Sequence, residues 1–143
     1  MAPRPPHPPA SSWRDLLLRA LAEDVGAGDL TSQLTLPEDL EVEAVLVARA
    51  PLVVCGLQLA ASAFLEIDTR IRFEAALEES AGASADDPLA FVAGPARAVL
   101  TAERTALNFV GRMSGVATTT REFVQRVAGT GAQIVDTRKT LPG

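Results

Sequence analysis

The sequence predicts an α+β fold for residues 12–112, in which a sheet of short strands packs against helices. Two observations support this fold class. Several segments alternate apolar and polar residues, which is typical of half-buried strands, and others repeat apolar residues every three or four positions, which is typical of amphipathic helices. Glycine and proline mark the boundaries between these segments. The pattern of residues 113–143 predicts a helix that leads into the first strand of another domain.

Helical periodicity is found in four segments. Apolar residues spaced along one helix face predict helices over residues 13–24, 56–67 and 95–113. The serine and glycine at residues 114–115 are expected to break the third helix. A further helix is then expected over residues 116–128.

Alternation predicts strands at four places in the first domain, which are residues 41–49, 52–55, 70–77 and 89–93. The turn-rich segment 78–88 is expected to be a loop. After a glycine turn at residues 129–131, residues 133–135 are expected to begin the strand of the second domain.

The composition excludes several classes of function. The chain has 143 residues, a net charge of −5, one cysteine and one histidine. Nucleic-acid binding is disfavoured because phosphate backbones require a dense basic surface. The lone cysteine allows no internal disulfide, and with a single histidine it cannot build a metal cage.

The N-terminus predicts no structured element. Five of the first ten residues are proline, so residues 1–11 are expected to be a disordered tail. The tail lacks the apolar region of a secretory signal. No stretch approaches the roughly 18 consecutive apolar residues of a membrane span. We therefore expect a cytoplasmic protein that does not contact a membrane.

The strongest candidate for binding chemistry is the run DTRKTLPG at residues 136–143, which follows the last predicted strand. Sites in α/β folds lie at the carboxyl ends of strands. Arg138 can grip a carboxylate or phosphate through two hydrogen bonds, and Lys139 provides a compact point charge. Lys139 is also the only lysine among 13 lysine and arginine residues. A solvated, charged loop is the alternative interpretation.

A second candidate is Arg104, which lies with Arg97, Asn108 and Arg112 on one face of the predicted helix 95–113. A solvent-exposed helix face is the ordinary interpretation of such a stripe. The functional interpretation is that this face meets a partner surface that carries an anionic ligand. The glycine-containing loop 23–31 lacks the spacing of a phosphate-binding fingerprint, so Asp29 and Thr31 are expected to be capping or turn residues.

Four stretches together resemble the quinolinate phosphoribosyltransferase family, also called nicotinate-nucleotide pyrophosphorylase (carboxylating). They are residues 23–32, 103–109, 114–118 and 136–143. The loop 78–88 departs from the glycine turn that is usual in the family. The resemblance implies an α+β N-terminal domain followed by an α/β barrel, of which residues 113–143 would be the start.

The resemblance implies a glycosyltransferase of the pentosyltransferase class. Such enzymes join quinolinate to 5-phosphoribosyl diphosphate and release diphosphate and CO2, which yields nicotinate mononucleotide for NAD synthesis. Mg2+ accompanies the diphosphate, and its ligands would lie outside this chain. Both substrates are anionic, so the site would be rich in cations and electrostatic stabilisation would be the main catalytic contribution.

The resemblance also implies residue roles. Thr137, Arg138 and Lys139 match substrate-binding positions, and Lys139 would be catalytic as well. Arg104 matches an arginine that one subunit of a homodimer lends to the site of the other, which would explain an exposed arginine without a partner in its own chain. The remaining site residues of the family would lie beyond Gly143, so the 143-residue chain alone is expected to be inactive. The alternatives are a paralogue with another substrate, such as the homologue associated with molybdenum transport, and a non-catalytic dimerisation module.

Overall fold

The computed structural model describes residues 8–137, 139 and 140. Arg138 lies outside the described residues, and so do the first seven residues and the last three. The helices are α1 (Arg14–Val25), α2 (Leu30–Thr35), α3 (Leu57–Ile67) and α4 (Ala96–Val127), preceded by a 3-10 turn, η1 (Ala10–Ser12). The strands are β1 (Glu41–Val47), β2 (Leu52–Val53), β3 (Arg72–Ala75), β4 (Gly82–Ala83) and β5 (Pro88–Pro95). The predicted α+β class of the first domain is confirmed.

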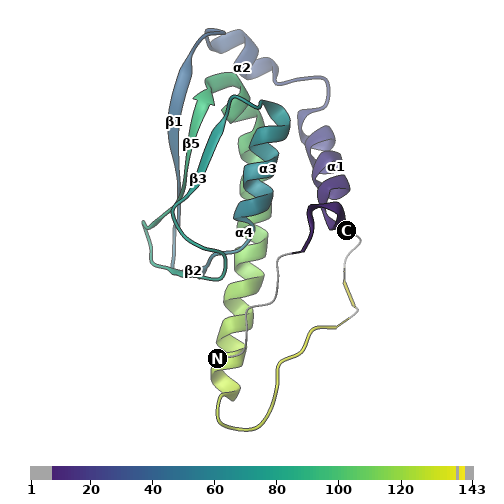
Figure 1. The fold of residues 1–143 in the computed structure, drawn as a ribbon, viewed down its shortest axis with the longest axis vertical. Coiled ribbons are helices and arrows are strands. Elements are labelled where there is room, and N and C mark those ends of the chain that lie inside the picture. Colours follow the sequence, from purple (N-terminus) through teal and green to yellow (C-terminus); the bar gives the residue numbers. More distant parts are fainter. Residues whose placement is uncertain (1–7, 138, 141–143) are drawn as a thin grey trace.

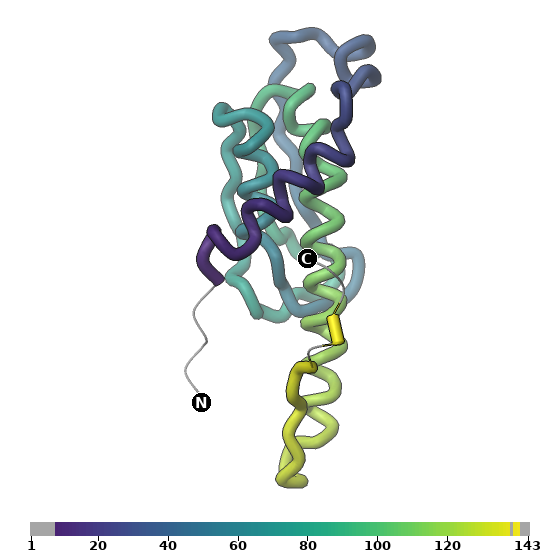
Figure 2. The backbone as a smooth tube through the Cα atoms, turned by 90° about the vertical axis from the view of Figure 1, so that its right-hand side faces the viewer, coloured from purple at the N-terminus to yellow at the C-terminus, as the bar shows by residue number. Residues whose placement is uncertain are grey.

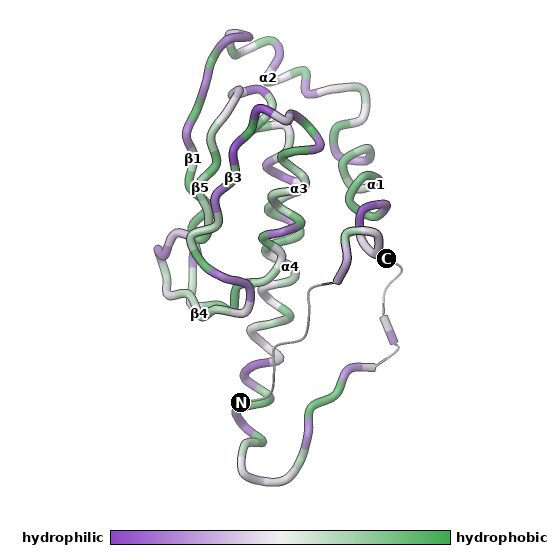
Figure 3. The backbone as a smooth tube through the Cα atoms, in the orientation of Figure 1, coloured by the Kyte–Doolittle hydropathy of each residue, from purple (hydrophilic) through white to green (hydrophobic). Residues whose placement is uncertain are grey.

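A three-stranded antiparallel sheet has the order β1-β5-β3. The alternation along β1 (Figure 3) places Val42 and Leu46 against the core, while Val45 and Val47 are exposed. The central strand β5 is paired on both edges and buries Leu89, Ala90 and Val92. The edge strand β1 is thus buried on one face, whereas the central strand β5 is more fully buried.

Small side chains bring α3 and α4 close together. Ala60 and Ala63 of α3 and Ala102 and Ala106 of α4 are at most 1% exposed. The two helices lie on one side of the sheet (Figure 1), and α1 crosses them obliquely (Figure 2). Leu17 fixes α1 there, because it is fully buried and contributes roughly 1.5–3 kcal/mol of burial free energy.

The predicted helix break at residues 114–115 is wrong. One helix, α4, runs without interruption over 32 residues. Ser114 is 1% exposed, and its Oγ accepts a hydrogen bond from Cys55 N (3.0 Å) and donates one to Cys55 O (3.1 Å). Thr118, one turn later, accepts a hydrogen bond from Val53 N (2.9 Å). These contacts bind the chain around β2 to α4, and they offset the cost of about 1 kcal/mol for glycine inside a helix.

We expect Ser114→Ala to lower the free energy of unfolding by about 1–3 kcal/mol, because it removes the partner of both partly buried backbone groups of Cys55. Urea unfolding followed by circular dichroism measures this change. Ser62→Ala is the matched control, because the Ser62 hydroxyl donates only to Gln58 O of its own helix. Equal losses for both variants would contradict the role given to Ser114.

Three other predictions differ from the structure. The segment 78–88 contains the short strand β4, which pairs with β2. The segment after Asp29 continues as α2, so Thr31 lies inside a helix, whereas the expectation that Asp29 is a capping residue is confirmed, because its side chain accepts a hydrogen bond from Ser32 N as the N-cap of α2. Residues 133–135 form no strand in the described part of the chain, where no neighbouring strand supplies hydrogen bonds. The assignment of residues 113–143 to a barrel therefore stays a prediction, and its boundary falls inside α4.

Candidate functional site

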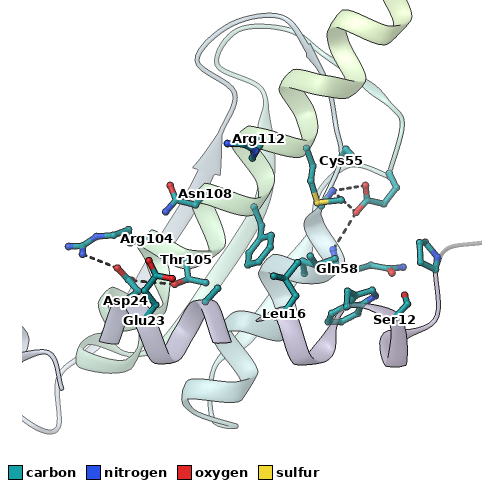
Figure 4. Close-up of a pocket in the computed structure, with 18 residues that line it drawn as sticks. Ser12, Leu16, Glu23, Asp24, Cys55, Gln58, Arg104, Thr105, Asn108 and Arg112 are labelled. Carbon is teal, nitrogen blue, oxygen red and sulfur yellow. Dashed lines mark hydrogen bonds and ion pairs between the residues drawn. The ribbon is translucent and has the colours of Figure 1, made fainter. Parts of the chain in front are cut away.

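A pocket of about 1060 Å³ lies between α1, α3 and α4 (Figure 4). Leu16 of α1, Leu59 of α3 and Phe109 of α4 supply apolar lining. Arg104 and Arg112 add two cations from α4. Glu23, Asp24 and Glu79 line it as well, so the pocket combines an apolar wall with charges of both signs.

Arg104 is exposed but has a partner in its own chain, contrary to the expectation. Its side chain is 75% exposed, and its Nη1 lies 2.9 Å from Asp24 Oδ1. The second oxygen of Asp24 accepts a hydrogen bond from Thr105 Oγ1 at 3.3 Å. Asp24 is itself only 19% exposed. The end of α1 is thus tied to α4 beside the exposed guanidinium.

The other members of the arginine stripe have different roles. Arg97 donates through Nε (3.1 Å) and Nη2 (2.7 Å) to Leu36 O at the end of α2, so the interpretation of Arg97 as a solvated residue is wrong. Arg112 is exposed and makes no hydrogen bond or ion pair within the described residues. Figure 4 shows Arg104, Asn108 and Arg112 along the same side of α4. The stripe therefore joins one structural arginine to two that face the pocket.

Cys55 lines the pocket but is not an activated nucleophile. Burial, together with the nearby Glu79 carboxylate, raises the pKa of its thiol. The thiol therefore stays protonated at neutral pH. Glu79 has a structural role as well, since its carboxylate accepts hydrogen bonds from Gly56 N and Gln58 N at the start of α3. Gly56 is required there because its φ is +101° and a Cβ would lie 3.0 Å from Met113 Sδ.

The residues predicted after α4 do not line this pocket. Thr137 and Lys139 are exposed, and the Lys139 backbone N donates to Thr137 Oγ1 at 3.2 Å. Arg138, predicted as part of the same group, lies outside the described residues. The structure therefore brings Arg104 and Asp24 together but does not bring Lys139 into the same site.

Nothing in the described part of the chain fits a resident metal ion. No group of three or more histidine, cysteine, aspartate or glutamate side chains is placed to hold one among residues 8–137, 139 and 140. No helix among these residues is long and apolar enough to span a membrane.

The sequence profile of the quinolinate phosphoribosyl transferase N-terminal domain matches residues 29–114. This chain belongs to that family. The nicotinate-nucleotide pyrophosphorylase of Mycobacterium leprae is 43% identical to it over 91% of this chain and 47% of the relative. The chloroplastic enzyme of Arabidopsis thaliana is 37% identical over 100% of this chain and 41% of the relative. The chain thus spans about half the length of the curated relatives it matches.

Solved structures of the family have the same fold. The nicotinate-nucleotide pyrophosphorylase of Francisella tularensis superimposes with a TM-score of 0.89 at 32% identity, over 95% of this chain and 49% of that chain. NadC of Streptococcus pyogenes superimposes with a TM-score of 0.91 at 27% identity, over 96% of this chain and 49% of that chain. The resemblance drawn from the four stretches is therefore confirmed.

Two of the four family stretches contact each other in the structure. The Asp24–Arg104 contact joins the stretch 23–32 to the stretch 103–109. The stretch 114–118 binds β2 through Thr118 and the nearby Cys55 through Ser114. Sequence reasoning treated the first stretch as a structural loop and missed Asp24. One signal was available: Asp24 is an acidic residue of a matching stretch and has no basic partner nearby in the sequence, which would have indicated a distant partner.

Proposed function

We propose that this chain forms the N-terminal half of a quinolinate phosphoribosyltransferase and acts in a protein of the relatives' length. The reaction would join quinolinate to 5-phosphoribosyl diphosphate, release diphosphate and CO2, and yield nicotinate mononucleotide for NAD synthesis. The observation that carries the proposal is the Arg104 guanidinium, which is 75% exposed on a long helix of a family member. A charge held in this way is available to an anionic ligand.

The charges of the substrate decide the residue roles. Quinolinate carries two carboxylates, and each charge-assisted hydrogen bond to one contributes roughly 1.5–3 kcal/mol. Arg104 would bind a carboxylate through its planar guanidinium. Thr137, Arg138 and Lys139 would contact the substrate from the segment after α4, with Lys139 stabilising the charge that develops as diphosphate leaves.

A homodimer would bring these groups together. Arg104 and Lys139 do not line one pocket within a single chain, so we propose that Arg104 enters the site of the other subunit. The exposed position of Arg104 supports this arrangement, because it leaves the guanidinium open to a second chain.

Further parts of the proposal concern the division into domains, the metal ion and the cellular location. Residues 12–112 would be the N-terminal domain and residues 113–143 the start of the barrel. Mg2+ would enter with the diphosphate of the substrate, and we assign it no ligand in this chain. The cytoplasm would be the site of the reaction.

The test is nicotinate mononucleotide formation from quinolinate and 5-phosphoribosyl diphosphate. The assay uses a full-length enzyme, in which residues 1–143 precede the second half that the relatives carry. We expect turnover in this enzyme and none above background with the 143-residue chain alone, because the chain offers only part of the cation set. Turnover by the short chain would overturn the proposed division of the site. A full-length protein that folds but uses another substrate would favour a paralogue, and one that only dimerises would favour a structural module.

A further inference from the structure

Asp24 occupies a position that is electrostatically unfavourable for α1 alone. It lies in the last turn of the helix, where the backbone carbonyls carry partial negative charge. It also lies on the same face as Leu17 and Leu21, which are buried against the rest of the fold. The carboxylate is therefore directed toward α4 by the packing of α1, and α4 must supply what compensates its charge.

The compensation comes from two adjacent residues of α4. Asp24 Oδ1 accepts from Arg104 Nη1 at 2.9 Å, and Asp24 Oδ2 accepts from Thr105 Oγ1 at 3.3 Å. Thr105 is 3% exposed, so the second contact fixes the carboxylate from the buried side. Figure 4 shows Asp24 between Arg104 and Thr105.

The contact with Asp24 leaves most N–H donors of the Arg104 guanidinium unbound within the described residues. An arginine side chain has five N–H donors, and only Nη1 of Arg104 is bound within the described residues. A flexible arginine at 75% exposure would otherwise sample many rotamers, and ligand binding would have to order it. One anchored nitrogen restricts the rotamers while the other donors stay free for a carboxylate.

We propose that Asp24 is a positioning residue, which holds the Arg104 guanidinium in the orientation that receives a carboxylate of the substrate. This inference rests on the proposed function. A purely neutralising role for Asp24 predicts the opposite behaviour, since removal of its negative charge would then strengthen the binding of an anion.

The test is a double-mutant cycle in the full-length enzyme, with KM for quinolinate and kcat measured separately. We expect Asp24→Ala to raise KM about tenfold, in line with the loss of one hydrogen bond between charged groups, and to leave kcat within about twofold. Asp24→Asn keeps an acceptor for Arg104 and should restore KM to within about threefold of wild type. In the Arg104→Ala background, Asp24→Ala should have no further effect on KM.

Glu23→Ala is the matched control, because it removes the same charge from the same pocket one residue earlier. An equal rise in KM for Glu23→Ala and Asp24→Ala, a fall in KM for Asp24→Ala, or an Asp24→Ala effect that persists without Arg104 would each overturn the inference. If Asp24→Ala fails to fold, Thr105→Val provides the second variant: we expect KM to rise about threefold only when Arg104 is present. If Arg104→Ala itself leaves KM unchanged, the proposed function fails, and this outcome is distinct from a failure of Asp24 alone.

Discussion

Lys139→Ala is expected to reduce kcat/KM of the full-length enzyme by about 100- to 1000-fold, the loss typical of removing one preorganised donor at a developing charge. The proposed reaction places new negative charge on the departing diphosphate, and an ammonium group is compact enough to follow that charge. Because the effect acts on the transition state, kcat should fall more than KM rises. Steady-state kinetics with each substrate varied in turn measures both quantities.

Lys139→Arg is the informative companion variant. It keeps the positive charge but replaces a point charge with a planar fork, so activity should fall between that of the wild type and that of Lys139→Ala. Arg126→Ala serves as the control, because Arg126 is exposed near the end of α4 and makes no hydrogen bond or ion pair within the described residues. If Lys139→Ala and Arg126→Ala have similar small effects, Lys139 is a solvated residue and not a catalytic one.

The spacing of apolar residues predicted those helices and strands that bury one face and expose the other. The strand at residues 41–49 and the helix at residues 56–67 agree with β1 and α3 to within two residues. The predictions failed where distant contacts decide the structure. Ser114 sits where a helix break was expected, yet its hydroxyl binds Cys55, which lies 59 positions earlier. The two-residue strand β4 likewise exists only through its pairing with β2.

The candidate site likewise contains one residue that the sequence predicted and one that depends on a distant contact. Arg104 could be predicted because residue type, helical spacing and family resemblance agreed on it. Asp24 could not, because its role depends on a contact across 80 positions that follows from how α1 crosses α4. Helical spacing places Asp24 on the same face of α1 as Leu17 and Leu21, but it does not identify the residue that the carboxylate contacts on a neighbouring helix. The packing of Leu17 and Leu21 sets the direction of the Asp24 carboxylate, and the three-dimensional structure is needed to describe that packing.

Mixing two strongly impaired full-length variants, Arg104→Ala and Lys139→Ala, is expected to restore about a quarter of wild-type activity if each site draws on both subunits of a symmetric dimer. In a mixed dimer, one site receives Lys139 from the first variant and Arg104 from the second, so it is intact. The other site lacks both residues. Random exchange places half of the chains in mixed dimers, each with one of its two sites restored. Nicotinate mononucleotide formation after subunit exchange measures the recovery.

The same experiment separates the shared site from a site within one chain. If Arg104 and Lys139 served the same site from a single chain, every site in every mixture would lack one of them and no activity would return. A mixture of Lys139→Ala with the Arg104→Ala, Lys139→Ala double variant is the control, because no site in it has Lys139 and exchange alone must restore nothing. Recovery in the first mixture but not in the control would therefore require that Arg104 crosses the subunit boundary. It would also explain why an exposed arginine is anchored at one nitrogen only: the guanidinium must keep its orientation on the surface of one chain in order to complete the site of another.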